Sequence, residues 1–230
     1  MNGGDPEDIL NRAARAPHEA DPALLARIAA SINSGLEPVR PLPAPWVLAS
    51  GLLAIWAAVA LAGAAAFGLY GIARLSGAEI AAIFPLLAAF AWAAAARIVA
   101  ETIPGSPRPV PSVFLAGGGI LALLTVFGLL FHDYRTERFV PQGLVCLETG
   151  VVHAAIAALG GWVVLRRGLA VEPVSAGLVA GTLAGLAGIA MLELHCPNLE
   201  ALHVMVWHTA VIPVSAGAGA LFGRLRSIWK

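Results

Sequence analysis

The residues best suited to chemistry are concentrated in one short stretch, ELHCPNLEALHVMVWH, from Glu193 to His208. These sixteen positions hold two glutamates, three histidines and a cysteine. Such side chains bind transition metals, and a thiol can also be oxidised to a disulfide. The second cysteine of the chain, Cys146, lies fifty residues before Cys196. Thiols and histidines in this number predict a metal site, a disulfide or a redox-active thiol pair.

The composition around this stretch is that of a membrane protein. The chain has 230 residues, of which 59% are hydrophobic and only 12% charged, and its mean hydropathy is +0.81. Soluble domains carry about 25% charged residues, so this apolar surface must be covered by lipid. The net charge is zero, which gives no reason to expect direct binding of nucleic acid.

Six apolar stretches are long enough to cross about 30 Å of hydrocarbon as helices. The predicted spans are Trp46–Tyr70, Ile80–Ala96, Pro111–Phe131, Leu144–Leu165, Pro173–Leu192 and Ala201–Gly223. In the fifth span, glycine recurs at positions 177, 181 and 185, a spacing that lets helix backbones approach closely. No Ser-His-Asp arrangement or carboxylate pair occurs within the spans, and we therefore do not expect an enzyme.

The distribution of Lys and Arg indicates the orientation. With a cytoplasmic N-terminus, eleven basic residues fall on the cytoplasmic side and three, Arg74, Arg135 and Arg138, on the other. Cytoplasmic loops carry the excess of basic residues, so both termini are expected in the cytoplasm. The predicted fold is an all-α membrane protein, a six-transmembrane-helix bundle with a short N-terminal cytoplasmic helical tail. Its parts are a tail and Pro-rich linker (1–45), a six-helix domain (46–223) and a basic C-terminus (224–230).

This topology collects the reactive residues at the outer face of the membrane, opposite the cytoplasm. Polar groups close to hydrocarbon are costly and usually functional. Three interpretations remain open: a disulfide between Cys146 and Cys196, a bound divalent metal ion, and a redox switch in which the thiol pair opens and closes. A structural disulfide, with histidines that only hydrogen-bond between helices, would also account for the pattern. The candidate metal ligands beside the thiols are His153, His195, His203, His208, Glu193 and Glu200.

Helical spacing constrains the metal interpretation. His203 and His208 are five residues apart, about 140° around an α-helix, so they cannot both face one ion in an unbroken helix. No Cys-x-x-Cys or His-Glu-x-x-His motif is present. His153 and His208 are expected at similar depth, which would allow a haem between them. The alternative functions are therefore a small membrane metal-binding or haem-binding redox protein, or a metal carrier.

The polar N-terminal segment carries a second signal. Asp21-Pro22 is typical of a helix start, and Leu24, Leu25, Ile28 and Ile32 follow it at helical spacing and form one apolar stripe. The first 45 residues hold six acidic residues against four arginines, which favours a protein groove over a membrane surface as the partner. LEPVRPLPAPW, residues 36–46, then predicts a stiff, extended spacer.

Several of these motifs resemble one known family. LLARIAASINSGLEPVRPLPAPW at the start, Cys146 at the beginning of the fourth span, HCP at 195–197 and HVMVWHTAVIPVSAGAGALFGRLR at the end are similar to the NrsF-like proteins, which are multi-pass membrane anti-sigma factors. The resemblance extends over nearly the whole chain. The middle spans match only in hydrophobicity.

The resemblance implies a specific function. The tail would hold an extracytoplasmic-function sigma factor at the bacterial inner membrane through Leu24, Leu25, Ile28 and Ile32. Cys146 and Cys196 would sense an oxidant or a heavy metal in the periplasm and cause release. The chain lacks the cytoplasmic His-Cys-Cys zinc motif of other anti-sigma factors, so inhibition should not depend on cytoplasmic zinc.

Overall fold

The computed structural model describes residues 7, 11, 21–34, 42–103, 105–108, 110–165 and 172–228. The chain divides into two compact units, Met1–Pro41 and Leu42–Lys230, and each is described by itself. Residues 36–41 of the predicted spacer lie outside the described residues.

The main described element of the first unit is helix α2 (Pro22–Ser34). Asp21 begins it as predicted: its Oδ1 accepts a hydrogen bond from the backbone N of Ala23 at 2.9 Å. Pro22 fits the first turn because an amide at that position has no partner within the helix. The four stripe side chains are all exposed, by 44% for Leu24, 52% for Leu25, 46% for Ile28 and 57% for Ile32.

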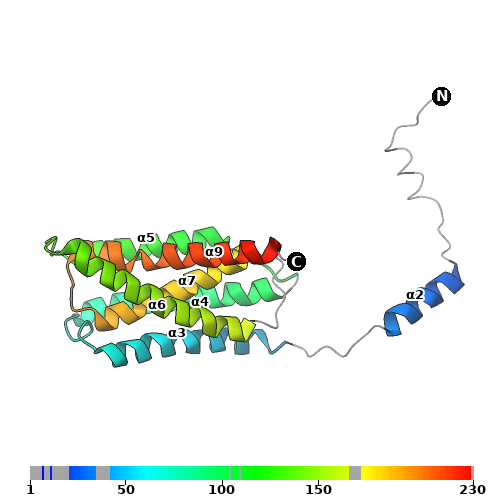
Figure 1. The fold of residues 1–230 in the computed structure, drawn as a ribbon, viewed down its shortest axis with the longest axis horizontal. Coiled ribbons are helices and arrows are strands. Elements are labelled where there is room, and N and C mark those ends of the chain that lie inside the picture. The colour runs from blue at the N-terminus through cyan, green and yellow to red at the C-terminus, as the bar shows by residue number, and fades with distance from the viewer. Residues whose placement is uncertain are drawn as a thin grey trace. The chain divides into compact units, whose positions relative to one another are not determined.

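The second unit is a bundle of membrane-length helices (Figure 1). Within the described residues, six segments are long and apolar enough to cross a membrane. This confirms the predicted all-helical fold and makes the chain a multi-pass membrane protein. The start of α3 and the end of α9 lie at the same end of the bundle (Figure 1). We call it the terminal end, and the opposite one the thiol end. The helices are α3 (Pro45–Phe67), α4 (Gly77–Thr102), α5 (Ser112–Leu130), α6 (Phe139–Leu165), α7 (Pro173–His195), and a last span of α8 (Ala201–His203), the π-helical turn η1 (Val204–His208) and α9 (Val211–Ile228).

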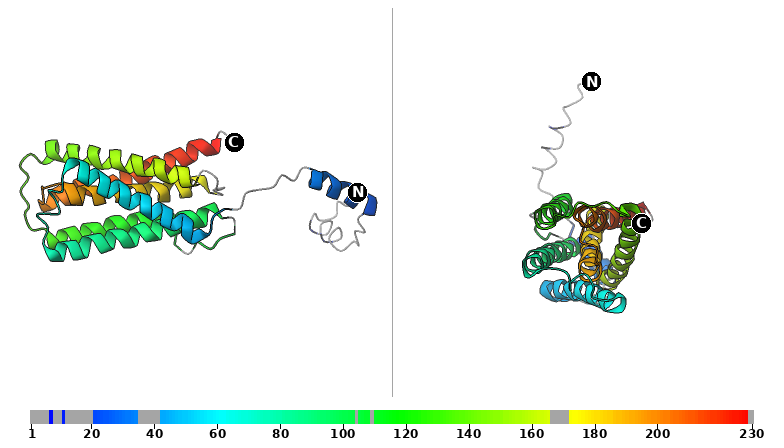
Figure 2. Two further views of the ribbon diagram at one scale, coloured as in Figure 1. Left: turned by 90° about the horizontal axis from the view of Figure 1, so that it is seen from below. Right: turned by 90° about the vertical axis from the view of Figure 1, so that its left-hand side faces the viewer.

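Helix α7 is the core of the bundle. Seen end-on in Figure 2, it lies inside the ring formed by the other membrane helices, and it contacts α3, α4, α5, α6 and α9. Its residues from Gly181 to Leu194 are all buried. A helix that is apolar on every side is usually buried on every side. The sequence of α7 has no polar face, which agrees with its position at the centre of the bundle.

Glycines of α7 allow α9 to come into backbone contact. A methyl group added at Gly177 would collide with the carbonyl oxygen of Gly219, and one added at Gly181 would collide with that of Ser215. The predicted role of the glycine repeat in close packing is thus explained, because no other residue leaves room for the facing backbone.

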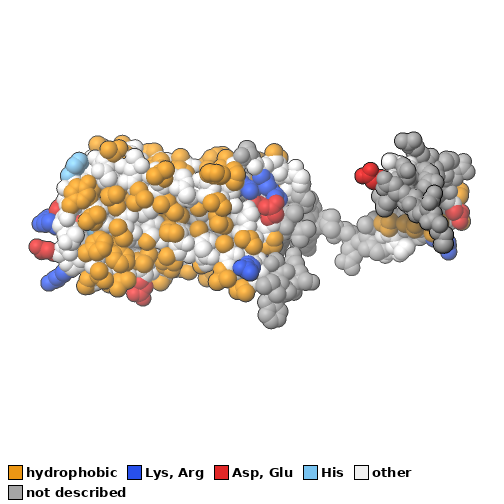
Figure 3. Space-filling view, turned by 90° about the horizontal axis from the view of Figure 1, so that it is seen from above, with side chains coloured by type: hydrophobic (Ala, Val, Ile, Leu, Met, Phe, Trp, Pro, Cys, Tyr) orange, Lys and Arg blue, Asp and Glu red, His pale blue; other side chains and the backbone are white. Residues whose placement is uncertain are grey.

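The outer surface of the bundle suits a bilayer. Figure 3 shows one face on which apolar side chains cover the middle and charged side chains gather at the two ends. Trp46 is 70% exposed at the first turn of α3, a position typical of a tryptophan at a membrane interface.

Several predicted span boundaries differ from the observed helix ends by three residues or more, among them the end of α9 at Ile228 instead of Gly223. Helix α4 continues six residues past Ala96 to Thr102, because Arg97 and Glu101 pair with each other at 2.7 Å. Helix α6 begins at Phe139 rather than Leu144. Cys146 therefore lies seven residues inside the helix, not at its start. Helix α7 ends at His195 rather than Leu192, because the Glu193 side chain is buried in a contact with His208.

Candidate functional site

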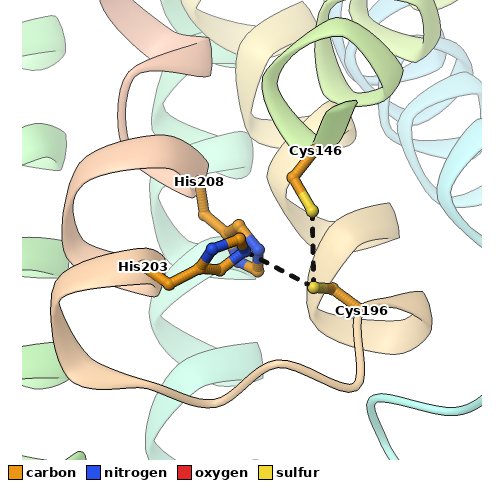
Figure 4. Close-up of side chains that lie close together, drawn as sticks. All are labelled: Cys146, Cys196, His203 and His208. Atoms are coloured by element: carbon orange, nitrogen blue, oxygen red, sulfur yellow. Dashed lines mark hydrogen bonds between the residues drawn. The ribbon is translucent and has the colours of Figure 1, made fainter. Parts of the chain in front are cut away.

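Four of the predicted reactive residues come together at the thiol end. Figure 4 shows Cys146, Cys196, His203 and His208 pointing toward one another. Cys146 comes from α6, Cys196 follows the last residue of α7, and the histidines come from α8 and η1. One ligand atom from each of the four residues lies within 4.8 Å of those from the other three. We call this group the Cys-His site.

The distances within the site are short. The two sulfurs are 3.5 Å apart, and both cysteines are free thiols. Cys196 Sγ is 3.6 Å from His203 Nε2. Cys196 is 4% exposed, and His203 and His208 are both 0% exposed, while Cys146 is half-buried. Groups that bind metals or undergo oxidation are thus held together away from water.

The end of α7 places Cys196. The backbone N of Cys196 donates to Leu192 O at 2.7 Å, and Pro197 follows, a residue that disfavours helix in the position before it. The segment after α3 holds this end in place, because the backbone N atoms of Gly71 and Ile72 both donate to Leu194 O at 3.1 Å.

The π turn places the two histidines. Sequence spacing predicted that His203 and His208 could not face one ion in an unbroken helix, and the helix is indeed not a regular one. Val204–His208 forms a π-helical turn, in which residues five apart come to the same face. The two imidazole rings lie 5.3 Å apart between centroids. The condition attached to the prediction, a break in the regular α-helix, is therefore present at these residues.

Glu193 supports the site from behind. His208 Nδ1 is 2.7 Å from Glu193 Oε1, and the two side chains are 1% and 0% exposed. With Nδ1–H donated to the carboxylate, the other ring nitrogen Nε2 is left with a lone pair. Nε2 is buried and has no hydrogen-bond partner. Glu193, a candidate metal ligand in the sequence, lies outside the group of four and orients the His208 ring.

The remaining predicted ligands lie outside the group of four. His153 Nδ1 is 2.8 Å from Thr149 O and its ring meets Phe67 edge-on. His195 Nδ1 is 2.9 Å from Gly68 O. Glu200 is also not in the group. His153 packs against Phe67 at the end of α3, whereas His208 bonds to Glu193 of α7.

The loop between α5 and α6 closes over this end. The backbone N of Ala201 donates to Asp133 O at 2.7 Å. Asp133 also pairs with Arg135, and the hydrogen bond from that guanidinium lowers the pKa of the Asp133 carboxyl below its usual value. The Asp133 backbone thus bonds the first residue of α8, while its carboxylate pairs within the loop.

A second buried polar group lies at the terminal end, and the sequence analysis missed it. Glu101 is 0% exposed and pairs with Arg97 Nη1 at 2.7 Å and Arg108 Nη2 at 3.4 Å. Ser175 of α7 donates to its Oε1 at 2.6 Å. We call these four residues the ion-pair cluster. An Arg and a Glu four residues apart at the end of an apolar span are the signal that could have revealed it.

Comparison with known proteins gives one match. A family model described as negative regulator of sigma F, NrsF, matches residues 33–229, which is most of the chain. No curated protein and no solved structure matches the chain significantly.

Proposed function

Because the chain belongs to the NrsF family of negative regulators of sigma F, we propose that it is an anti-sigma factor anchored in the bacterial inner membrane. In this proposal its N-terminal tail holds an extracytoplasmic-function sigma factor in the cytoplasm. A redox or metal signal at Cys146 and Cys196, on the periplasmic side, causes release. A regulator of this kind acts by binding, so no catalytic residue is assigned.

The exposed apolar face of α2 is the observation that carries the proposal. Leu24, Leu25, Ile28 and Ile32 are each between 44% and 57% exposed. A helix of thirteen residues is marginal in water by itself, and burial of this face in a groove would stabilise both the helix and the complex. Amphipathic helices bind protein grooves through anchors at such spacings.

The family match supports the function but not the binding surface. It begins at residue 33, and the stripe ends at Ile32. The assignment of the binding surface to α2 thus depends on the residues of this chain alone. The composition of the tail, with more acidic than basic residues, favours a protein over an anionic lipid surface.

The thiol pair supplies a chemically defined signal. With the sulfurs 3.5 Å apart, a two-electron oxidant such as a peroxide would convert two thiols to a disulfide, with loss of two protons to the reduced oxidant. Bond formation would draw α6 toward the end of α7. The Leu194 carbonyl, which accepts from Gly71 and Ile72, links that movement to α3, the helix that follows the tail in sequence.

The test is a double substitution in α2. Leu25→Glu with Ile28→Glu should free a co-expressed sigma factor and raise transcription from its target promoter. Burial of two such side chains contributes about 3–6 kcal/mol, so binding should weaken by at least about 100-fold. Unchanged transcription, with the protein still present in the membrane, would refute the assignment of α2.

The chain offers a matched control on the same helix. Ala26 and Ala30 lie about one helical turn apart, as Leu25 and Ile28 do, and both are exposed. At about 100° per residue they lie on the opposite face of α2. Ala26→Glu with Ala30→Glu adds the same charge to the tail and should leave repression intact. Release by both double variants would mean that charge or helix disruption, and not the apolar face, is responsible.

A further inference from the structure

The Cys-His site has the composition and geometry of a closed metal centre. We propose that Cys146, Cys196, His203 and His208 bind one Zn²⁺ ion as a Cys₂His₂ site. This inference deepens the proposed function, because it concerns the same residues that are proposed to receive the signal. It states that the thiols are zinc ligands in the resting protein.

The distances agree with a tetrahedron around zinc. Zinc binds sulfur at about 2.3 Å and nitrogen at about 2.0–2.1 Å, so tetrahedral geometry separates two sulfurs by about 3.8 Å and a sulfur from a nitrogen by about 3.6 Å. The sulfurs here are 3.5 Å apart, and Cys196 Sγ is 3.6 Å from His203 Nε2. Small side-chain adjustments complete the geometry, since all four ligand atoms already lie within 4.8 Å of one another.

The orientation of His208 is the one that a metal ligand requires. Histidines that bind metals usually donate their other N–H to a carboxylate or carbonyl, which fixes the tautomer and the ring orientation. Glu193 Oε1 is 2.7 Å from His208 Nδ1, and the buried Nε2 has no hydrogen-bond partner. A buried nitrogen without a partner is costly, and coordination of an ion would remove that cost.

Charge and ligand type favour zinc over other ions. Two thiolates balance the double positive charge of the ion within a buried site, and the two imidazoles are neutral. Magnesium, calcium and manganese prefer oxygen ligands, whereas the group of four contains none. The protein fills all four positions, which is typical of a structural zinc site and not of a catalytic one.

The ligands come from segments that are distant in sequence, and this gives the ion a mechanical role. Cys146 lies on α6, Cys196 at the end of α7, and the histidines on α8 and η1. A bound ion would hold these three segments together at the thiol end. Oxidation of the thiols, or their capture by a more thiophilic metal, would remove two of the four ligands and release that constraint.

The test is the metal content of the full-length protein. The chain would be purified in detergent without chelators from zinc-supplemented cells and analysed by elemental mass spectrometry. The wild type should contain close to one zinc per chain, and replacement with Co²⁺ should produce the thiolate-to-cobalt charge-transfer absorption of a tetrahedral thiolate site. Wild-type protein without zinc, and with two thiols that react freely after unfolding in the absence of reductant, would overturn the inference.

Four variants make the test specific. Cys146→Ser and His203→Gln should each lower zinc content at least tenfold. His203→Cys should retain zinc, because a Cys₃His set also binds it, and this variant distinguishes a lost ligand from a misfolded protein. His195→Gln is the matched control, since His195 is close by but bonds to Gly68 O. Equal zinc loss in His195→Gln and His203→Gln would also overturn the inference.

The result is separable from the proposed function. The Leu25→Glu, Ile28→Glu protein should release the sigma factor and still contain zinc. If it releases the sigma factor but the wild type holds no zinc, only the metal site is wrong. If zinc is present but this variant does not release the sigma factor, the proposed binding surface is wrong and the metal site stands.

Discussion

Replacement of Glu101 by Gln tests whether the ion-pair cluster determines the stability of the bundle. The substitution keeps the shape of the side chain and removes its charge. Arg97, which is 9% exposed, then faces a neutral amide at the position where it formed an ion pair at 2.7 Å. Arg108, 20% exposed, loses its contact with Glu101 at 3.4 Å and keeps only the one with Glu172.

The expected loss of unfolding free energy follows from this burial. Removal of one partner from a buried ion pair costs about 3–5 kcal/mol, because the other charge is left without compensation. The measurement is an SDS titration of the full chain in mixed micelles, followed by far-ultraviolet circular dichroism. A change below about 1 kcal/mol would refute the reasoning, because such a value is typical of an exposed pair.

Two further variants identify the cause. Glu172→Gln removes the other carboxylate that pairs with Arg108. That contact is 2.7 Å, but Glu172 is 61% exposed, so a loss of about 0–1 kcal/mol is expected. Arg97→Met with Glu101→Leu removes both charges and should recover most of the stability, because an apolar pair of similar volume often replaces a buried ion pair without loss. A double variant as unstable as Glu101→Gln would show that packing, not the unpaired charge, was lost.

Two other predictions concern the packing of α7 and the signal. Gly177→Ala should destabilise the chain by about 1–3 kcal/mol in the same titration, because the added methyl group meets the backbone of Gly219, whereas Gly217→Ala, with open space around it, should be neutral or stabilising. Equal effects at the two glycines would contradict the close approach of α7 and α9. Cys146→Ser and Cys196→Ser should each abolish the transcriptional response to oxidant or heavy metal in the reporter strain; a response of wild-type size in either would exclude the thiol switch.

The sequence was sufficient for the number of spans because an apolar run of membrane length has few other structures open to it. It was less informative at the span ends. Arg97, Glu101 and Glu193 have the composition of loop residues, yet each lies in a helix because its partner is buried with it. Such partners are distant in sequence or on the next helical turn. A hydropathy profile treats each residue by itself and therefore does not predict these pairs.

The site was predicted in part for a related reason. Spacing alone placed Cys146, Cys196 and the histidines at one end, but could not select which of them meet. His195 and His153 have the same residue type as His203 and His208 and lie at the same end, yet they bond to backbone carbonyls. Which histidines join the Cys-His site depends on the π turn, and no local sequence pattern predicts that turn. The one hint is the five-residue interval between His203 and His208, which is the interval that a π turn aligns.

The π turn also has a consequence for the phase of the last span. One surplus residue rotates everything after it by about 100° relative to a regular α-helix. The same helix can therefore aim His203 at Cys196 and, sixteen residues later, aim Gly219 at Gly177. Without the surplus residue, one of these two alignments would be lost. The π turn thus lets one helix direct His203 toward the Cys-His site at one end and Gly219 toward the glycines of α7 further along.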